Sequence, residues 1–201
     1  MNYGAVGKRI AVILGSLKLP MSDEEALELL RLKGFKALDV DIIALARQNL
    51  GKSQYVRGVS VSKAPKVIDC SSFTKWLFAQ RGIWLPRRSV QQRRFGLPVE
   101  PEEIAPLDLI FATGFKNYYV DDEAEGVGHV GIVTDTDTVI HCASPALGLI
   151  ESPVESFTMS VKFRGARRYI PPGSRLLTFE IPPGVDIETS DDIRWTLVPP
   201  V

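Results

Sequence analysis

The sequence is short of the residues that build metal sites and disulfide frameworks. It contains only two cysteines, Cys70 and Cys142, and only two histidines, His129 and His141. Two cysteines cannot form a disulfide framework, and free thiols in a reducing compartment are the simpler interpretation. A run of about 20 apolar residues is also absent, which excludes a membrane-spanning helix.

An excess of either charge is absent as well. Lys plus Arg number 24 and Asp plus Glu number 24, so the formal net charge is zero. Because nucleic-acid-binding proteins usually show a basic excess, this balance argues against a nucleic-acid partner. The 201 residues, 45% of them hydrophobic, suit one globular domain with at most a small appendage. None of these quantities predicts the oligomeric state.

The N-terminus carries no clear export signal. Lys8 and Arg9 precede the apolar stretch 10–14, as in a signal peptide, but Gly15 and Lys18 interrupt it and no small-x-small cleavage site follows. We therefore expect a buried strand or loop at this stretch and a cytoplasmic location. Export without a classical signal is the alternative.

Hydrophobic periodicity predicts helices in the first half of the chain. A capping box at Ser22–Glu25 opens the first, and Gly34 stops it. Gly82 ends a helix that begins at Cys70 and has an apolar stripe at helical spacing. The predicted helices cover about residues 22–33, 39–50 and 70–81, and the stretches 52–66 and 86–92 are interpreted as loops or short turns.

Strand patterns replace helical ones after residue 104. Turn residues at 135–138 separate two apolar runs, which predicts a β-hairpin. The predicted strands cover residues 107–112, 129–134, 139–143 and 161–170. Helices followed by an antiparallel sheet indicate the α+β class.

Two segments stand apart from this pattern. Residues 115–128 form a long insertion with Tyr118 and Tyr119, which can cover or reshape a site beside it. Residues 171–201 contain three Pro-Pro pairs and strand-like runs at 175–181 and 193–198. We divide the chain into a helical N-terminal segment (1–38), a main domain (39–170) and a Pro-rich, β-like C-terminal extension (171–201).

Cys70 and the two histidines form the candidate catalytic set. A cysteine at a helix N-terminus meets the positive end of the helix dipole, which favours the thiolate that acyl transfer requires. A histidine can hold the proton and later return it to the leaving amine, while a third polar group orients the imidazole. A cysteine on a helix packed against an antiparallel sheet that carries His129 and His141 is the arrangement of a papain-like site.

Two simpler interpretations compete with catalysis. Cys70 can be an inert core thiol, with structural histidines on the strands. The second interpretation is a zinc site made of both cysteines and both histidines, but the sequence has no pair of ligands at the short spacing typical of zinc sites. Adjacent His141 and Cys142 also point to opposite faces of a strand. We expect neither a metal nor a cofactor.

Five short strings occur in the order and spacing of a known family. They resemble the NlpC family of papain-like bacterial cell-wall cysteine peptidases over about residues 39–170. The strings are DCSSF at 69–73, GIWLPRRSVQQ at 82–92, PLDLIF at 106–111, GHVGIV at 128–133 and VIHCAS at 139–144.

The resemblance implies a role for each matching residue. Cys70 corresponds to the nucleophile, His129 to the base, and His141 to the residue that orients the base. Tyr55 corresponds to a tyrosine that helps to stabilise the oxyanion, together with the Cys70 backbone N–H. Three further positions correspond to residues that line the substrate cleft, with Asp69 available to pair with a substrate α-amino group; they are Asp69, Ser71 and Ser89.

The motifs also depart from the family pattern. Ser72 stands where the family usually has Gly, Arg57 where it has Trp, and Leu107 where it has Gly. None of these changes removes a catalytic group, but together they bear on the shape of the cleft and on the substrate.

Five arginines lie between residues 81 and 94. They can bind anionic groups such as substrate carboxylates. A solvated face, paired with the acidic run Asp121–Glu123, is the simpler interpretation.

The resemblance implies hydrolysis of an amide bond in a peptidoglycan stem peptide or muropeptide, between γ-D-glutamate and a diamino acid. Two alternatives stay open. The same triad can act on another amide or acyl substrate, as a secreted effector amidase or acyltransferase does, or the fold can serve as a non-catalytic binding module.

Overall fold

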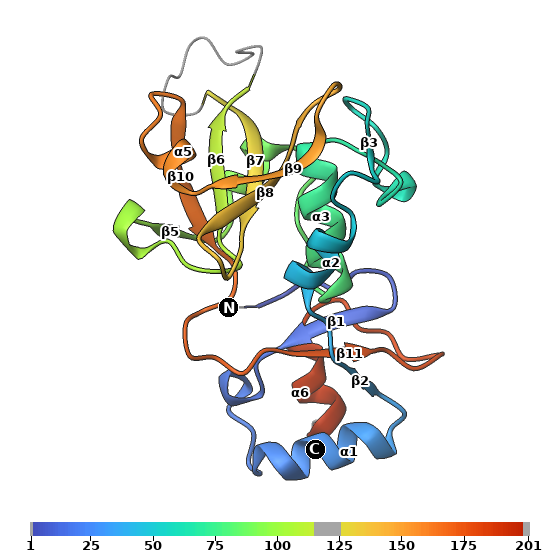
Figure 1. Cartoon of the computed structure of the whole chain (residues 1–201). Coiled ribbons are helices and arrows are strands. Elements are labelled where there is room, and N and C mark those ends of the chain that lie inside the picture. The colour runs from blue at the N-terminus through green and yellow to red at the C-terminus, as the bar shows by residue number, and fades with distance from the viewer. Residues whose placement is uncertain (1, 115–125, 199–201) are drawn as a thin grey trace. The chain divides into compact units, whose positions relative to one another are not determined.

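The computed structural model describes residues 2–114 and 126–198. Most of the insertion at 115–128, with Tyr118 and Tyr119, therefore lies outside the described residues. The chain divides into two compact units (Figure 1). One comprises residues 1–41, 78–84 and 172–201, and the other comprises residues 42–77 and 85–171.

The first unit contains a three-stranded antiparallel sheet. Its order is β1 (Arg9–Val12), β11 (Leu177–Glu180) and β2 (Lys36–Leu38), so a strand near the C-terminus pairs with two strands near the N-terminus. The apolar stretch after Arg9 is thus a buried strand, as expected. Side chains of the sheet, of α1 (Asp23–Leu32) and of α6 (Asp192–Leu197) share one apolar core, which includes Ile10, Val12, Leu30, Phe35, Phe179, Ile193 and Leu197.

Of the two sequence predictions made for the helical segments of this unit, one is confirmed and one is wrong. The capping box of α1 is confirmed, because Ser22 Oγ accepts from the Glu25 N–H at 3.2 Å and Glu25 Oε2 accepts from the Ser22 N–H at 2.8 Å. The predicted strand at 193–198 is wrong, because this run forms α6. Ile193 and Leu197 lie four residues apart and bury on one helical face, which satisfies the core without a strand.

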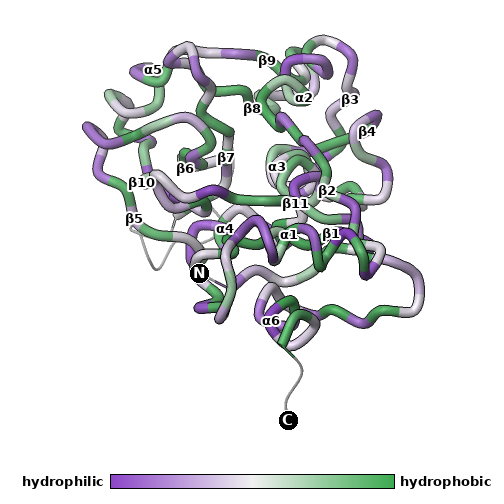
Figure 2. The backbone as a smooth tube through the Cα atoms, turned by 90° about the horizontal axis from the view of Figure 1, so that it is seen from below, coloured by the Kyte–Doolittle hydropathy of each residue, from purple (hydrophilic) through white to green (hydrophobic). Residues whose placement is uncertain are grey.

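The second unit contains a six-stranded antiparallel sheet. Its order is β5 (Leu97–Val99), β10 (Phe163–Arg168), β6 (Leu109–Thr113), β7 (Val127–Val133), β8 (Thr138–Ser144) and β9 (Gly148–Pro153). The central strands are strongly hydrophobic, as the green colour along β8 in Figure 2 shows. Buried side chains of this sheet, such as Ile110, Val133 and Val139, pack with Phe157 into a core.

The predicted hairpin is confirmed as β7 and β8. Its turn places Asp137 in the left-handed region at φ 57°, where a short polar side chain is tolerated. The first predicted strand, at 107–112, begins two residues later than expected. Leu107 has φ 76°, so the chain turns there before β6 begins at Leu109.

A buried ion pair fixes the turn before β6. Asp108 is 1% exposed and accepts hydrogen bonds from Arg168 Nε at 2.8 Å and Arg168 Nη2 at 2.7 Å. The Ala105 N–H donates to the same carboxylate at 2.9 Å. This pair joins β10 to the turn and stands outside the residues that line the cleft described below.

Helices and a parallel strand pair complete the second unit. They are α2 (Ile42–Gln48), β3 (Gln54–Tyr55), β4 (Val67–Ile68), α3 (Cys70–Gln80), α4 (Ser89–Arg94) and α5 (Glu155–Thr158). The last three residues of α3, 78–80, are assigned to the first unit. The helix predicted from Cys70 is confirmed, whereas the loops predicted at 52–66 and 86–92 contain β3 and the start of α4. Within the described residues, no helix has the length and apolarity needed to cross a membrane.

Candidate active site

The start of α3 fixes the position of Cys70. Cys70 is the first residue of the helix, and Asp69 caps it: Asp69 Oδ1 accepts from the Ser72 N–H at 2.7 Å. In return, Ser72 Oγ accepts from the Asp69 N–H at 2.8 Å. These reciprocal bonds satisfy backbone groups that a helix start otherwise leaves unpaired. Ser72, the departure from the family's Gly, is therefore part of the cap.

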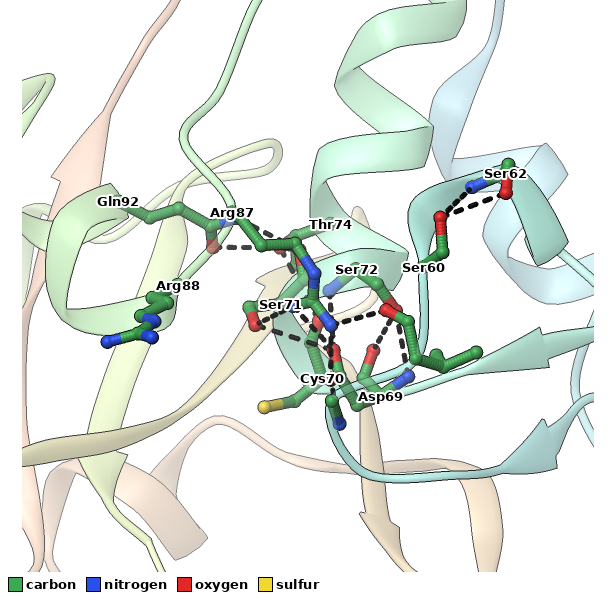
Figure 3. A network of polar contacts seen from close by, with 12 residues as sticks. Ser60, Ser62, Asp69, Cys70, Ser71, Ser72, Thr74, Arg87, Arg88 and Gln92 are labelled. Atoms are coloured by element: carbon green, nitrogen blue, oxygen red, sulfur yellow. Dashed lines mark hydrogen bonds and ion pairs between the residues drawn. The ribbon is translucent and has the colours of Figure 1, made fainter. Parts of the chain in front are cut away.

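Arg87 joins the segment before α4 to this cap. Its Nη2 lies 2.6 Å from Asp69 Oδ2, and its Nη1 donates to Asp69 Oδ1 at 3.1 Å and to Ser71 Oγ at 3.0 Å (Figure 3). Burial raises the pKa of Asp69, but the bonds from Arg87 and from the backbone N–H groups of Ser72 and Gly58 outweigh burial and hold the pKa below its usual value. Asp69 is therefore an anion whose charge Arg87 compensates.

Gln92 provides a second link between α4 and α3. The side chain is fully buried, its Nε2 donates to the backbone oxygens of Ser71 and Pro86, and its Oε1 accepts from Thr74 Oγ1 at 2.9 Å. Arg87 and Gln92 together hold the predicted loop 86–92 in place, which explains why this segment is ordered as a turn and a helix.

The two histidines meet across β7 and β8. His141 pairs with Gly131, two residues after His129, and His129 Nε2 lies 2.9 Å from His141 Nδ1. A side chain at Gly131 would not fit, because a Cβ there would lie 2.4 Å from Val139 Cγ1 and 2.9 Å from His141 Cβ. Gly131, the second glycine of the GHVGIV string, therefore leaves the space that the His141 side chain occupies.

Two residues that the sequence analysis did not single out complete the histidine pair. Ser152 on β9 lies with its Oγ 3.0 Å from His141 Nε2, so the polar chain runs from His129 through His141 to Ser152. Phe157 on α5 stacks on His129 with ring centroids 6.2 Å apart and meets His141 edge-on at 4.9 Å. No spacing or motif in the sequence marks either residue.

Burial keeps both imidazoles neutral. Burial first and the neighbouring His141 second lower the pKa of His129 to about 3, and burial lowers the pKa of His141 to about 4. At neutral pH a neutral His129 therefore has a ring nitrogen free to accept a proton, which a base in acyl transfer requires.

The Cys70 thiol is neutral as well. Burial and the adjacent Asp69 carboxylate raise its pKa to about 11, against opposing hydrogen bonds from the backbone of Val130 and Ser71 and the charge of Arg87. The helix start was expected to favour the thiolate, but burial has the larger effect here. The contact with the backbone of Val130 also places the sulfur beside β7, at the residue that follows His129.

One cleft brings the predicted site residues together. It is a cavity of about 950 Å³ in the second unit. Its lining includes every residue to which the sequence analysis assigned a catalytic or substrate-binding role, namely Tyr55, Asp69, Cys70, Ser71, Ser89, His129 and His141. The individual roles assigned to these residues stay predictions. Within the described residues, no group of three or more His, Cys, Asp or Glu side chains is placed to hold a metal ion.

The family model described as "NlpC/P60 family" matches residues 52–168, more than half of the chain. The chain belongs to the NlpC/P60 family. The match covers the segments that line the cleft, from Tyr55 on β3 to Lys162 before β10. The family and the similar solved structure confirm the papain-like α+β fold predicted from the sequence.

Individual relatives agree with this assignment. The chain is 32% identical over 104 residues to a "Gamma-D-glutamyl-L-lysine dipeptidyl-peptidase" of Bacillus cereus, covering 51% of this chain and 29% of the relative. It is 30% identical over 132 residues to a "Gamma-DL-glutamyl hydrolase" of Bacillus subtilis, covering 65% of this chain and 29% of the relative. The matched regions thus span under a third of these two proteins.

A solved structure supports the fold. The crystal structure of an NlpC/P60 family protein from Bacillus cereus superposes with a TM-score of 0.55 at 27% identity, over 65% of this chain and 40% of that one.

Proposed function

We propose that this protein is a cysteine peptidase that hydrolyses an amide bond in peptidoglycan stem peptides, between γ-D-glutamate and a diamino acid. The observation that carries the proposal is the polar chain His129–His141–Ser152 in the same cleft as a cysteine at a capped helix start. Two relatives support the bond type, because both are named for action on γ-glutamyl compounds.

The mechanism follows from the neutral resting state of the site. Because the Cys70 thiol and the His129 imidazole are both neutral, the thiol proton passes to His129 as the sulfur attacks the carbonyl carbon. The resulting imidazolium donates from Nε2 to His141 Nδ1, and His141 in turn donates from its own Nε2 to Ser152 Oγ.

The later steps use the same groups. Tyr55, which lines the cleft, and the Cys70 backbone N–H donate to the oxyanion of the tetrahedral intermediate. His129 then protonates the leaving amine, and the acyl group stays on Cys70 as a thioester. Water, deprotonated by His129, hydrolyses the thioester and regenerates the thiol.

A digest of defined muropeptides, read by mass spectrometry, tests this proposal. We expect the wild-type protein to cut between γ-D-glutamate and the diamino acid, and Cys70→Ala to cut nothing. Cys142→Ala is the matched control, because Cys142 is the other thiol and does not line the cleft; it should retain activity. Failure of the wild-type protein to cut free stems and intact sacculi alike would overturn the assignment.

A further inference from the structure

Two segments of the second unit carry positive charge without any acidic residue. Residues 85–99 contain four arginines, and residues 156–171 contain three arginines and one lysine, with no Asp or Glu in either segment. The whole chain, by contrast, balances 24 basic with 24 acidic residues. The two segments lie side by side, because β5 pairs with β10. Positive charge is therefore concentrated on one part of the second unit.

Two of these arginines are compensated and two others are not. Arg87 and Arg168 each form an ion pair with a buried aspartate. In the part of the chain that the structure describes, the hydrogen bonds of Arg93 and Arg167 go to backbone carbonyls and not to an acid. Arg93 Nε donates to the Arg164 carbonyl, and Arg167 Nε donates to the Arg93 carbonyl at 2.8 Å. These bonds hold the two side chains in place and leave both charges uncompensated.

A β-bulge brings the two guanidinium groups to the same point of the backbone. The pairing of β10 with β6 shifts register between Phe163 and Ala166, and Gly165 within the shift has φ 91°, which favours glycine. A Cβ at Gly165 would lie 3.6 Å from Arg167 Nη1 and 3.9 Å from both Nε and Nη2 of Arg93. Two half-buried cations thus flank a residue that has no side chain.

The like charges affect each other. Burial first and the charge of Arg93 second lower the pKa of Arg167, although a guanidinium still stays protonated at neutral pH. Arg164, in the same bulge, adds a third cation: its Nη1 donates to carbonyls of its own segment, and its buried Nε has no hydrogen-bond partner among the described residues. A bound ion is one explanation for an unsatisfied donor in such a cluster.

We infer that Arg93 and Arg167 form a binding site for a phosphate group beside Gly165, separate from the catalytic cleft. Neither arginine lines that cleft, so the inference goes beyond the proposed function and does not depend on it. The planar fork of a guanidinium pairs with phosphate oxygens through charge-assisted hydrogen bonds. A phosphate dianion has oxygens for both forks and balances both charges, whereas a carboxylate has one charge and two oxygens.

Thermal unfolding of the full chain tests the site, because a ligand that binds the folded state raises the melting temperature in a saturable way. The probes are inorganic phosphate, glycerol 3-phosphate and the diester dimethyl phosphate, each compared with sodium chloride at equal ionic strength and pH 7.5. We expect inorganic phosphate to stabilise the wild-type protein. Arg93→Gln or Arg167→Gln should weaken its binding about tenfold, on the scale of a lost hydrogen bond to a charged group.

Two further variants separate a specific site from general charge attraction. Arg175→Gln removes an exposed arginine of the first unit and should leave phosphate binding unchanged. Arg93→Lys keeps the charge but loses the fork, so it should weaken binding nearly as much as Arg93→Gln. Full binding by Arg93→Lys would overturn paired recognition by the guanidinium.

The remaining outcomes decide the source of the phosphate and the fate of the inference. Binding of inorganic phosphate and glycerol 3-phosphate without the diester supports a small phosphorylated ligand, and equal binding of the diester supports a phosphate within a polymer. No stabilisation beyond that of sodium chloride by any of the three probes overturns the inference. Binding that survives the combined Arg93→Gln and Arg167→Gln changes overturns the assignment to these two residues.

Discussion

The two walls of the cleft hold their candidate catalytic residues by different physical means. The helix wall, made of Asp69, Cys70, Ser71 and Arg87, is joined by an ion pair and hydrogen bonds that link separate chain segments. The sheet wall, made of His129, His141, Ser152 and Phe157, is a neutral chain of rings with one hydroxyl at its end.

The difference has a consequence for pH. The hydrogen bonds from Arg87 and from the backbone hold the pKa of Asp69 below its usual value, so Asp69 stays an anion over the whole neutral range and the helix wall keeps its ion pair as pH changes there. The sheet wall depends on two imidazoles that burial keeps uncharged, so acid acts directly on it. An ion pair thus fixes the position of the helix wall, whereas neutral imidazoles on the sheet wall are available for proton transfer.

Removing the acid of the helix wall should have the largest effect. Asp69→Asn breaks the pair with Arg87, and loss of one partner of a buried ion pair costs about 3–5 kcal/mol of unfolding free energy. We expect the lower end, because Arg87 is 32% exposed and can reach water. Urea unfolding followed by fluorescence measures the change.

Asp108→Asn is the matched control, because Asp108 forms the same type of pair with Arg168 away from the cleft. Both variants should be destabilised, but only Asp69→Asn should speed alkylation of Cys70 at pH 8, since the Asp69 charge raises the pKa of that thiol. Equal alkylation rates in the two variants would show that Asp69 has no electrostatic influence on the nucleophile.

The second prediction concerns the thiol itself. With a pKa of about 11, the thiolate fraction of Cys70 rises about tenfold per pH unit, so iodoacetamide labelling should accelerate by about 10³ between pH 7 and pH 10. Mass spectrometry of the labelled protein gives the rate, and Cys70→Ala corrects for Cys142. A plateau below pH 8 that disappears in His129→Gln would instead reveal a preformed thiolate–imidazolium pair.

The sequence predicted candidate catalytic residues that the structure places on both walls of one cleft, but not how the walls are held. Cys70, His129 and His141 could be selected from the sequence because few residue types serve in nucleophilic acyl transfer and both histidines of the chain fall in one predicted hairpin. Arg87 lay within a string used for the family resemblance, yet its partner was not predictable, because ion pairs between distant segments leave no periodic signal.

Ser152 and Phe157 were missed for a related reason. Each contributes through its position on a neighbouring element, β9 or α5, and neither of these elements was predicted. The wrong strand at 193–198 shows the same limit: short apolar runs suit a strand or a helix, and the core of the unit decides between them. Local pattern supplied the candidate catalytic residues, and tertiary packing determined which side chains support them.

Acid should destabilise the sheet wall specifically. The pKa of His129 is about 3 in the folded protein and about 6.5 when unfolded, so between these values the unfolded state binds more protons and stability falls as pH falls. From pH 7 to pH 4 this group alone accounts for up to about 3 kcal/mol of unfolding free energy.

Urea unfolding at a series of pH values measures this loss. His129→Gln should flatten the dependence between pH 4 and pH 6.5, because glutamine does not titrate. The variant and the wild-type protein should differ less in slope below pH 3, where His129 is protonated in both states. An unchanged slope in the variant would mean that carboxylates, and not the histidine pair, dominate the acid response.

The smallest effect is expected at the end of the polar chain. When His129 is an imidazolium, His141 must accept at Nδ1 and therefore carries its proton on Nε2, which donates to Ser152 Oγ. Ser152→Ala leaves this donor unpaired and permits the other tautomer, so kcat should fall about tenfold with little change in KM, on the scale of one buried hydrogen bond. Ser152→Thr, which keeps the hydroxyl, should recover most of the rate.

Ser156→Ala is the control for Ser152, because Ser156 also lines the cleft but donates to the Pro153 carbonyl and not to a histidine. A merely structural role for Ser152 would lower the melting temperature and leave the pH profile of kcat unchanged. A positioning role predicts that Ser152→Ala shifts the acid limb of the profile, whatever its effect on the melting temperature, because that limb reports protonation of the His129–His141 pair. Equal kcat values for Ser152→Ala and Ser156→Ala would show that Ser152 does not act on the reaction through the His129–His141 pair.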